Sequence, residues 1–425
     1  MKTNKTLLSC AVAFGLASVS TFTQAAGFQL AEYSATGLGR AYAGEAAMAD
    51  NASAQWRNPA MLTYLEGTQI SAGAIYVNPN VDVEGTVNHA QLGKTHASSN
   101  DFAHDAVIPN FYLSHQLNEQ VALGFALGTN YGMETDLGTE FAASHFGNQA
   151  SVISKEANLN IAYQILPQLS IGGGVRYVMG EGHFGATVPP QLNAVKPGFA
   201  GKTLKYMEGE DTSWGWQVGS AWQINDAHRL GFAYKSEVVM DFDGHAEGIF
   251  YGGKKSGMMS IALPATAELA SFHQLNEQWA IHASINWTDW SSFKELTAVF
   301  SDGPDPIKLE NWEDNYRFAI GTTYQYDAKL ALRAGVAYDT SAVDDKNRTA
   351  TIPETDRTWV SVGGSYIATP QLTLDAGFTY IFAKDATINE PRDASDQTAA
   401  AIGGAFTGNV SGNVWLIGVQ ANYRF

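Results

Sequence analysis

Apolar and polar residues alternate along several stretches of the chain, and this alternation predicts β-strands with one apolar and one polar face. In residues 279–287 the odd positions hold Trp, Ile, Ala, Ile and Trp, whereas the even positions hold Ala, His, Ser and Asn. Residues 316–326 and 372–382 repeat the pattern. After the N-terminal segment no stretch approaches 18 consecutive apolar residues, so the sequence predicts no membrane-spanning helix.

The connections between the predicted strands alternate between short and long. Six short polar turns and seven longer polar or Gly-rich connections make thirteen connections, which predicts fourteen strands. An even strand number with this alternation is typical of outer-membrane barrels. The turns lie near residues 117–120, 166–168, 225–227, 275–277, 326–328 and 368–370, and the long connections near 79–106, 131–152, 181–211, 243–258, 291–314, 341–356 and 383–411.

The two ends of the chain support an exported barrel. Residues 1–25 combine two lysines, an uncharged apolar stretch and small residues before Ala26, which is the pattern of a secretory signal peptide. Residues 415–425 alternate and end on Phe425, which resembles the signal that the barrel-assembly machinery reads. We therefore expect an all-β, 14-stranded antiparallel transmembrane β-barrel, residues 68–425, in the outer membrane of a Gram-negative bacterium.

Residues 26–67 do not alternate. They are rich in Ala and Gly, contain helix-favouring stretches and include a break at Asn58-Pro59. Such a segment is too small to fold alone, and we expect it to fill the lumen as a helical hatch, or plug. The alternative is a periplasmic tail, which would be more polar.

Composition excludes several classes of function. The chain is 45% hydrophobic and only 16% charged, and its net charge of −17 argues against nucleic acid as a partner. Its only cysteine, Cys10, lies in the predicted signal peptide, which excludes thiol chemistry in the exported protein. The sequence has neither a Gly-x-Ser-x-Gly nor a His-Glu-x-x-His motif, so we expect no enzyme, no cofactor and no metal site.

Some long connections are unexpectedly apolar. Ile249, Phe250, Tyr251, Met258 and Met259 lie where a porin would carry polar loops. Exposed apolar surface usually marks a binding site. The alternative is that these loops pack against one another.

Several motifs resemble the long-chain fatty acid outer-membrane transporter (FadL) family. The resemblance runs over the whole exported chain and implies a monomeric barrel that imports long-chain fatty acids or other hydrophobic small molecules and delivers them into outer-membrane lipid. The matching motifs are residues 26–30, 37–42, 57–60, 130–132, 278–282, 316–317 and 347–348.

The resemblance also implies a route through the wall. In the family an Asn-Pro-Ala motif of the hatch, here Asn58, Pro59 and Ala60, sits beside an inward kink of the third strand that opens a lateral gap. The third strand here, residues 120–130, meets Asn130-Tyr131-Gly132 at its end, where glycine would relieve a bend. From the residues alone this would be an ordinary strand end.

The family further has an inner pocket in which basic residues bind the ligand carboxylate. Lys308 matches one basic position, whereas Ala186 stands where the family has an arginine, with His183 nearby as a substitute. A lower-affinity groove would lie between residues 181–211 and 248–259. The competing functions are a non-specific porin, an aromatic-hydrocarbon transporter of the same fold, and a purely structural role.

Overall fold

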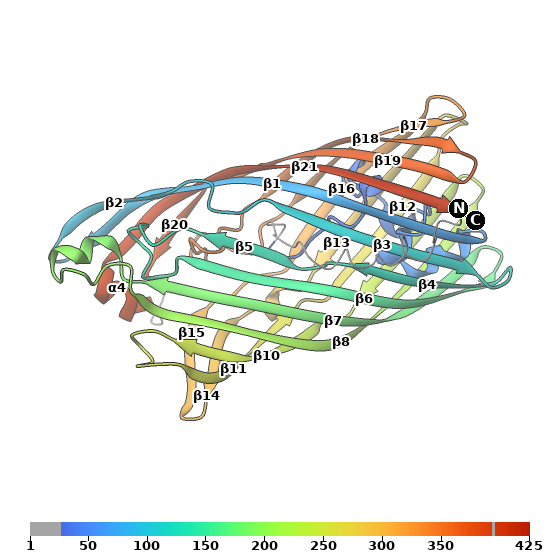
Figure 1. Ribbon diagram of the computed structural model, residues 1–425. Coiled ribbons are helices and arrows are strands. Elements are labelled where there is room, and N and C mark those ends of the chain that lie inside the picture. The colour runs from blue at the N-terminus through green and yellow to red at the C-terminus, as the bar shows by residue number, and fades with distance from the viewer. Residues whose placement is uncertain (1–26, 393–395) are drawn as a thin grey trace, which may run out of the picture.

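The first and last strands of the chain pair with each other and close an antiparallel barrel (Figure 1). β1 (Thr68–His89) lies against β21 (Ala405–Arg424), from Gln69 opposite Arg424 to Asn88 opposite Ala405. The structure is a computed structural model that describes residues 27–392 and 396–425. The predicted signal peptide, residues 1–25, lies outside the described residues.

Within the described residues the barrel wall consists of fourteen antiparallel strands, which we call staves because some of them are interrupted. This confirms the number predicted from the turns. Three of the staves are interrupted and consist of two strands each. Besides β1 and β21, the staves are β3 (Ala106–Gln116), β4 (Val121–Gly128) with β5 (Gly132–Asp136), β6 (Gln149–Leu166), β7 (Leu169–Thr187), β8 (Thr203–Asn225), β9 (His228–Lys235) with β10 (Val238–Glu247), β11 (Lys255–Leu263) with β12 (Thr266–Gln274), β13 (Trp279–Thr288), β16 (Asn315–Gln325), β17 (Leu330–Asp339), β18 (Arg357–Thr369) and β19 (Leu372–Ala383).

Four further strands lie in the long connections and lengthen the wall at the end of the barrel opposite the short turns. β2 pairs with β1, β14 pairs with β11 and β15, and β20 pairs with β21. Two of them, β14 and β15, form a hairpin that projects from the barrel in Figure 1. The bounds are β2 (Gly93–Ser99), β14 (Glu295–Phe300), β15 (Gly303–Leu309) and β20 (Ala386–Glu390), with short helices η3 (Pro190–Ala194), η4 (Trp290–Ser292) and α4 (Gln397–Gly403) beside them.

The two faces of each stave are the reverse of those in a soluble protein. On β13 the apolar side chains of Trp279, Ile281 and Ile285 point outward and are 42%, 37% and 49% exposed, whereas His282 and Ser284 are buried in the lumen. This arrangement suits a barrel whose outer surface faces lipid. The alternation that predicted the strands therefore distinguishes a lipid face from a lumenal face.

The predicted bounds of the long connections were too wide. β1 continues to His89, β7 to Thr187 and β8 begins at Thr203, although the sequence placed connections at residues 79–106 and 181–211. The strands extend beyond the apolar band, where both faces can be polar. Hydropathy therefore does not distinguish strand from loop in this part of the wall.

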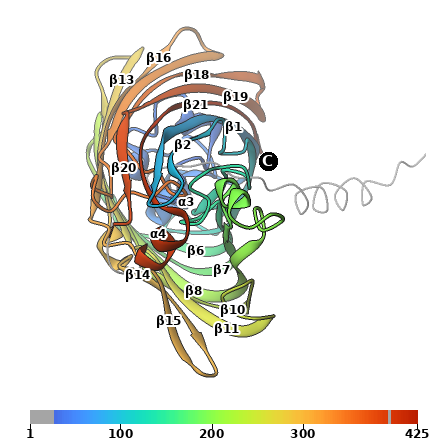
Figure 2. The ribbon, with the colours of Figure 1, turned by 90° about the vertical axis from the view of Figure 1, so that its left-hand side faces the viewer.

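Residues 27–67 fill the lumen at the end that carries the short turns (Figure 1), and Figure 2 shows this segment inside the ring of strands. Nearly all of it is buried, as the hatch prediction requires and a periplasmic tail would not be. None of the helices in the described ranges is long and apolar enough to cross a membrane. The hatch contains four short helical turns, α2 (Ala35–Leu38), η1 (Glu45–Ala47), α3 (Ala54–Arg57) and η2 (Pro59–Tyr64).

Ion pairs hold the hatch to itself and to the wall, and the pair of Arg40 with Glu45 is buried. The Arg40 guanidinium lies 2.7 Å from a carboxylate oxygen of Glu45 and 2.7 Å from one of Asp50, and Arg333 of β17 lies 3.8 Å from Asp50. Burial by itself would raise the pKa of Asp50, but Arg40 and Arg333 overcome this effect and lower the pKa to about 2. The pairing compensates for charges that would be costly to bury alone.

Glycines in the lumenal wall allow the hatch backbone to approach the strands. A Cβ atom on Gly172 would lie 2.4 Å from the Ala60 nitrogen, one on Gly231 would lie 1.9 Å from the Ala46 oxygen, and one on Gly335 would lie 2.2 Å from the Arg40 oxygen. These contacts are with backbone atoms, which cannot rotate away. Any side chain at these positions would push the hatch from the wall.

This packing makes a testable prediction about ion flow. Gly172→Val should displace η2 and raise the single-channel conductance in planar bilayers, because the hatch would no longer fill the lumen. The neighbouring Gly173→Val is the matched control, since a Cβ there has no non-neighbour atom closer than 3.6 Å. Equal conductance of the two variants would contradict a hatch held by close contact with the wall.

Candidate functional site

An apolar cavity lies in the half of the lumen that the long connections cover. It contains about 860 Å³ of space free of protein atoms, part of it open to solvent, and its wall comes from β5–β8, β10, β11 and the connection that carries β14 and β15. Most of its lining is apolar, so the cavity suits an apolar ligand.

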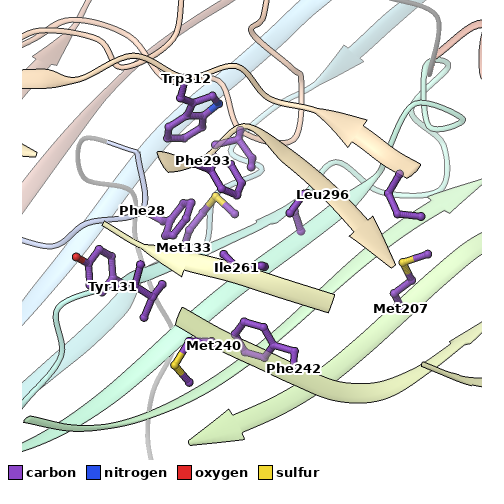
Figure 3. Packing of buried hydrophobic residues seen from close by; sticks show 14 of the residues in the cluster. Phe28, Tyr131, Met133, Met207, Met240, Phe242, Ile261, Phe293, Leu296 and Trp312 are labelled. Atoms are coloured by element: carbon purple, nitrogen blue, oxygen red, sulfur yellow. The ribbon is translucent and has the colours of Figure 1, made fainter. Parts of the chain in front are cut away.

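Four aromatic rings form a cluster beside this cavity, and two of them, Phe28 and Phe293, line it. Phe28 of the hatch lies with its ring centroid 4.5 Å from Trp290 and 5.4 Å from Phe293, and Trp290 lies 4.9 Å from Trp312. Figure 3 shows Phe28, Phe293 and Trp312 turned toward one another. Gly27 precedes them with a positive φ of 62°, and a Cβ there would lie 2.4 Å from the Trp290 ring.

Methionines supply much of the remaining wall. Met133, Met207, Met258 and Met259 line the cavity, and Met240 belongs to the same buried cluster (Figure 3). Methionine is flexible and polarizable and adapts to irregular shapes. Together the rings and methionines form an apolar surface that can fit chains of different shape.

Lys308 projects from β15 into the cavity wall. It is 4% exposed, its Nζ donates a long hydrogen bond of 3.4 Å to the Thr351 hydroxyl, and the Nζ lies 5.3 Å from the centroid of the Phe184 ring. No carboxylate oxygen within the described part of the chain lies within 4.0 Å of this ammonium. His183 lines the same cavity and stacks on Tyr206, so the structure brings the two predicted head-group residues to one cavity.

Buried acids lie behind Lys308. Glu310 accepts a hydrogen bond of 3.3 Å from the Trp312 indole and lies 3.9 Å from the Arg392 guanidinium. Glu390 is 2% exposed and neither of its carboxylate oxygens has a hydrogen-bond partner. Burial raises the pKa of Glu390, Lys308 and Arg392 oppose this effect, and Asp396 and Glu310 add to it, so that the resulting pKa is about 7. Much of this carboxyl is therefore protonated at neutral pH.

Lys205 is a second cation near the cavity that the sequence reasoning missed. It stands on β8 directly opposite Ala186 of β7, the position at which the expected arginine is absent. Its ammonium interacts electrostatically with Lys308 and lies 6.0 Å from the centroid of the Phe250 ring. Only the register between β7 and β8 shows that these two positions are neighbours.

The predicted low-affinity groove divides between the cavity and the rim. Met258 and Met259 line the cavity, whereas Ile249 and Phe250 are each 44% exposed above it. Tyr251 donates a hydrogen bond of 3.0 Å to Asp305, and its ring centroid lies 5.4 Å from that of Phe300. The apolar loop residues thus extend from the rim into the cavity rather than forming a separate patch.

The third stave is interrupted at Asn130-Tyr131-Gly132. Across from β6, Gly128 pairs with Glu156 and Gly132 with Ile153, so residues 129–131 contain one more residue than the two opposite them. Such an extra residue bends the strand locally. We call residues 129–131 the kink.

The hatch bonds directly to the kink. The Leu30 N–H donates to the Asn130 oxygen at 2.7 Å, and the Gly132 N–H donates to the Phe28 oxygen at 2.8 Å. Beyond the kink, the Asp136 N–H donates to the Phe102 oxygen at 2.8 Å. On this side β5 therefore bonds to the hatch and to the first long connection instead of to β3.

The second stave consequently loses a neighbour. β3 pairs with β4 only from Gln116 to Phe111, whereas residues 106–110 pair with β1 alone within the described residues. Pro109, which has no backbone N–H, lies in this stretch, and proline in sheets is confined to edges and to places where a ladder ends. We call the interruption between residues 106–110 and β5 the wall break.

The Asn-Pro-Ala motif contacts other residues of the hatch and strands β7 and β8. The Asn58 side chain caps η2 by accepting from the Ala60 N–H at 3.0 Å and donates to the Ala46 oxygen at 2.6 Å and the Ser220 oxygen at 3.0 Å. Pro59 and Ala60 lie against β7 at Gly172. The residues of the hatch that contact the kink directly are Phe28–Leu30.

Within the described residues no three His, Cys, Asp or Glu side chains are grouped to hold a metal ion. The cavity offers apolar surface, two nearby ammonium groups and a protonatable carboxyl. These groups suit a long apolar ligand with a polar end.

Comparison with known proteins identifies relatives over the whole length. Residues 16–425 match the family described as outer membrane protein transport protein (OMPP1/FadL/TodX). Outer membrane protein P1 of Haemophilus influenzae is 33% identical over 463 residues and the match covers all of both chains. The long-chain fatty acid transport protein of Escherichia coli K12 is 32% identical over 460 residues, which cover 99% of each chain.

Solved structures share the fold. A Pseudomonas aeruginosa FadL homologue superposes with a TM-score of 0.84 at 22% identity, over 94% of this chain and 100% of that one. The Pseudomonas putida toluene transporter TodX superposes with a TM-score of 0.69 at 19% identity, over 94% of this chain and 100% of that one. Both confirm the barrel architecture.

The raised pKa of Glu390 predicts a pH-dependent loop. Because its folded-state pKa, about 7, lies above the ordinary 4.5, its stabilising contribution is complete below pH 4.5 and is lost as the pH rises through 7. Hydrogen-exchange protection of β20 should therefore fall between pH 5 and pH 8. Glu390→Gln should remove this fall, whereas Glu277→Gln, in a turn at the other end, should keep it. The same slope in all three proteins would contradict the assignment.

Proposed function

The chain belongs to the OMPP1/FadL/TodX family of outer-membrane transport proteins, and we propose that its cargo is long-chain fatty acids and similar amphiphiles with an anionic head. One observation carries the proposal. Lys308 is a buried amine with no carboxylate oxygen of the described residues within 4.0 Å, and it stands in the wall of a mostly apolar cavity. A ligand carboxylate would complete the pair.

The energetics of such a ligand fit the cavity. Burial of a long tail contributes about 0.8 kcal/mol per methylene, which the rings and methionines can provide. A carboxylate cannot be buried alone without a large penalty. An ammonium at one end of the cavity lowers this penalty for a fatty acid and offers nothing to an alkane.

Lys205 and His183 complete the proposed head-group site. Lys205 faces Ala186 across the strand pair and lies close enough to Lys308 for their charges to interact. It can supply the second cation that Ala186 cannot. His183 lines the same cavity and can donate a hydrogen bond to the carboxylate.

Two rival functions fit the geometry less well. A non-specific porin needs an open lumen, whereas the hatch fills this one. An aromatic-hydrocarbon transporter is favoured by the rings of Phe28, Phe293 and Trp312. It leaves the buried Lys308 without a role, because toluene-like ligands carry no charge. A purely structural role would leave the cavity itself unexplained.

The wall break supports a lateral route out of the barrel. The cargo would leave the cavity past the kink when the hatch segment around Phe28 moves, and would enter the membrane between β3 and β5. In an intact ladder the strands leave no opening to lipid. Diffusion down a concentration gradient would then be sufficient for uptake.

Assembly belongs to the same proposal. β21 ends the chain with an alternating strand and an exposed Phe425, the terminus that barrel-assembly machinery would recognise. The pairing of β1 with β21 closes the wall within one chain, so we propose a monomer.

The head-group site makes a prediction about ligand class. Lys308→Met should weaken binding of a fluorescent long-chain fatty acid to the purified protein by about 10–100-fold, the loss expected when a charged hydrogen bond is removed. Binding of the corresponding fatty alcohol should change little. Lys205→Met should give a smaller loss of the same kind.

Three outcomes distinguish the functions. Equal losses for acid and alcohol would mean that the substitution disturbs the cavity itself. Unchanged binding of both would move the head-group site away from Lys308. Absence of saturable binding in the unsubstituted protein, with large open-channel conductance, would favour the porin.

The lateral route makes a separate prediction. The exported chain lacks cysteine if the predicted signal peptide is removed, so Pro109→Cys with Thr129→Cys places a unique pair across the wall break. A short bifunctional maleimide that joins them should slow fatty-acid uptake by roughly tenfold or more, which corresponds to ~1.4 kcal/mol. Fatty-acid binding should remain.

The matched control joins two positions across the intact part of the same ladder. Phe111 and Leu127 are Cα partners, so cross-linking Phe111→Cys to Leu127→Cys leaves the wall break free. Equal uptake by both cross-linked proteins would contradict the lateral route.

A further inference from the structure

A layer of buried polar side chains lies beside the kink, and the proposed cavity does not use it. The carboxylate of this layer, Glu156, is already paired with other residues of the layer. Glu156 accepts two hydrogen bonds of 2.8 Å from the Arg176 guanidinium and a third from the Asn130 side chain. Arg176 donates in addition to the Ser236 oxygen at 2.8 Å.

Lys235 adds to this layer a buried amine without an ion pair in the described residues. It is 6% exposed, its Nζ donates to the neutral amide oxygen of Asn130 at 3.1 Å, and the Nζ lies 4.3 Å from the centroid of the Trp56 ring. No carboxylate oxygen of the described chain lies within 4.0 Å of it. The charged form of this amine is costly to bury without an anion, so a carboxylate bound beside it would stabilise the ammonium.

Two asparagines in the same part of the lumen lack partners. Asn110 and Asn158 are 2% and 0% exposed, and neither the amide oxygen nor the amide nitrogen of either one makes a hydrogen bond. Asn110 lies in the stretch of β3 that borders the wall break. Asn158 lies two staves along, opposite Ala126, which itself pairs with Tyr112. Their amide nitrogens are free donors for an anion.

Trp56 of the hatch covers this group. A Cβ on Gly128 would lie 3.0 Å from the Trp56 ring, and the Tyr112 ring centroid lies 6.0 Å from that of Trp56. The indole therefore fills the space between the end of β4, Tyr112 and the Lys235 ammonium. Movement of α3 would uncover the ammonium on the lumenal side of the wall break.

We propose that Lys235, with Asn110 and Asn158, forms a second head-group site that receives the carboxylate of an amphiphilic ligand between Lys308 and the wall break. This inference rests on the proposed function. The ligand's head group would pass from one buried ammonium to the next while its tail turns toward the membrane, and Trp56 would cover the second site when it is empty. Neutral ligands would gain nothing from it.

The test separates transport from binding. Lys235→Met, purified and reconstituted in liposomes, should slow uptake of oleate by about tenfold, a loss of ~1.4 kcal/mol. Uptake of oleyl alcohol should stay within about twofold of the unsubstituted protein. Equilibrium binding of oleate at the cavity should be unchanged, because Lys308 remains. Lys235→Arg should restore oleate uptake, since it keeps the charge.

Other results would overturn the inference. Equal slowing of oleate and oleyl alcohol would mean that Lys235 only supports the structure, and unchanged oleate uptake would mean that the site is not used. Asn158→Leu provides a second test if Lys235→Met fails to assemble, because removal of an unpartnered amide should not destabilise the barrel. This variant should slow the uptake of oleate and leave the uptake of oleyl alcohol unchanged. Failure of the unsubstituted protein to bind oleate would instead refute the proposed function.

Discussion

The pairing of backbone hydrogen bonds around the wall is the constraint on which the other features depend. A strand that faces lipid must find partners for its N–H and C=O groups, because no water is available there. The ladder between the second and third staves stops at Phe111 and Leu127. The protein replaces the missing partner of the third stave from inside, with Phe28 and Leu30 of the hatch and Phe102 of the first long connection. The hatch is therefore part of the wall's hydrogen-bond network.

Phe28 joins the wall break to the cavity. Its carbonyl accepts from Gly132 beside the kink, while its ring contacts Trp290 and Phe293 on the cavity side. A displacement of this residue changes the partner of the kink and the shape of the cavity together. This shared residue provides a physical reason why release from the cavity and access to the wall break would be coupled in the proposed transport.

Several charges of the lumen are held in close ion pairs, as buried charges generally require, and Arg40, Glu45, Glu156 and Arg176 are examples. Lys308 and Lys235 have no such partner in the described residues, and they stand beside the cavity and beside the kink respectively.

The sequence by itself determined the barrel, its fourteen strands and the existence of a separate lumenal segment, because the alternation of side chains and the turn composition are local. Its resemblance to a transporter family pointed to Lys308 and to the kink at Asn130. The sequence did not predict where the strands end on the side of the long connections, because apolar and polar residues no longer alternate outside the membrane. Only the tertiary structure decided that Lys205 faces Ala186, that Phe28–Leu30 rather than residues 58–60 bond to the kink, and that Lys235 lies under Trp56. The residues of these pairs are far apart in the chain, or their contact depends on strand register and backbone hydrogen bonds. Neither can be inferred from the residue types.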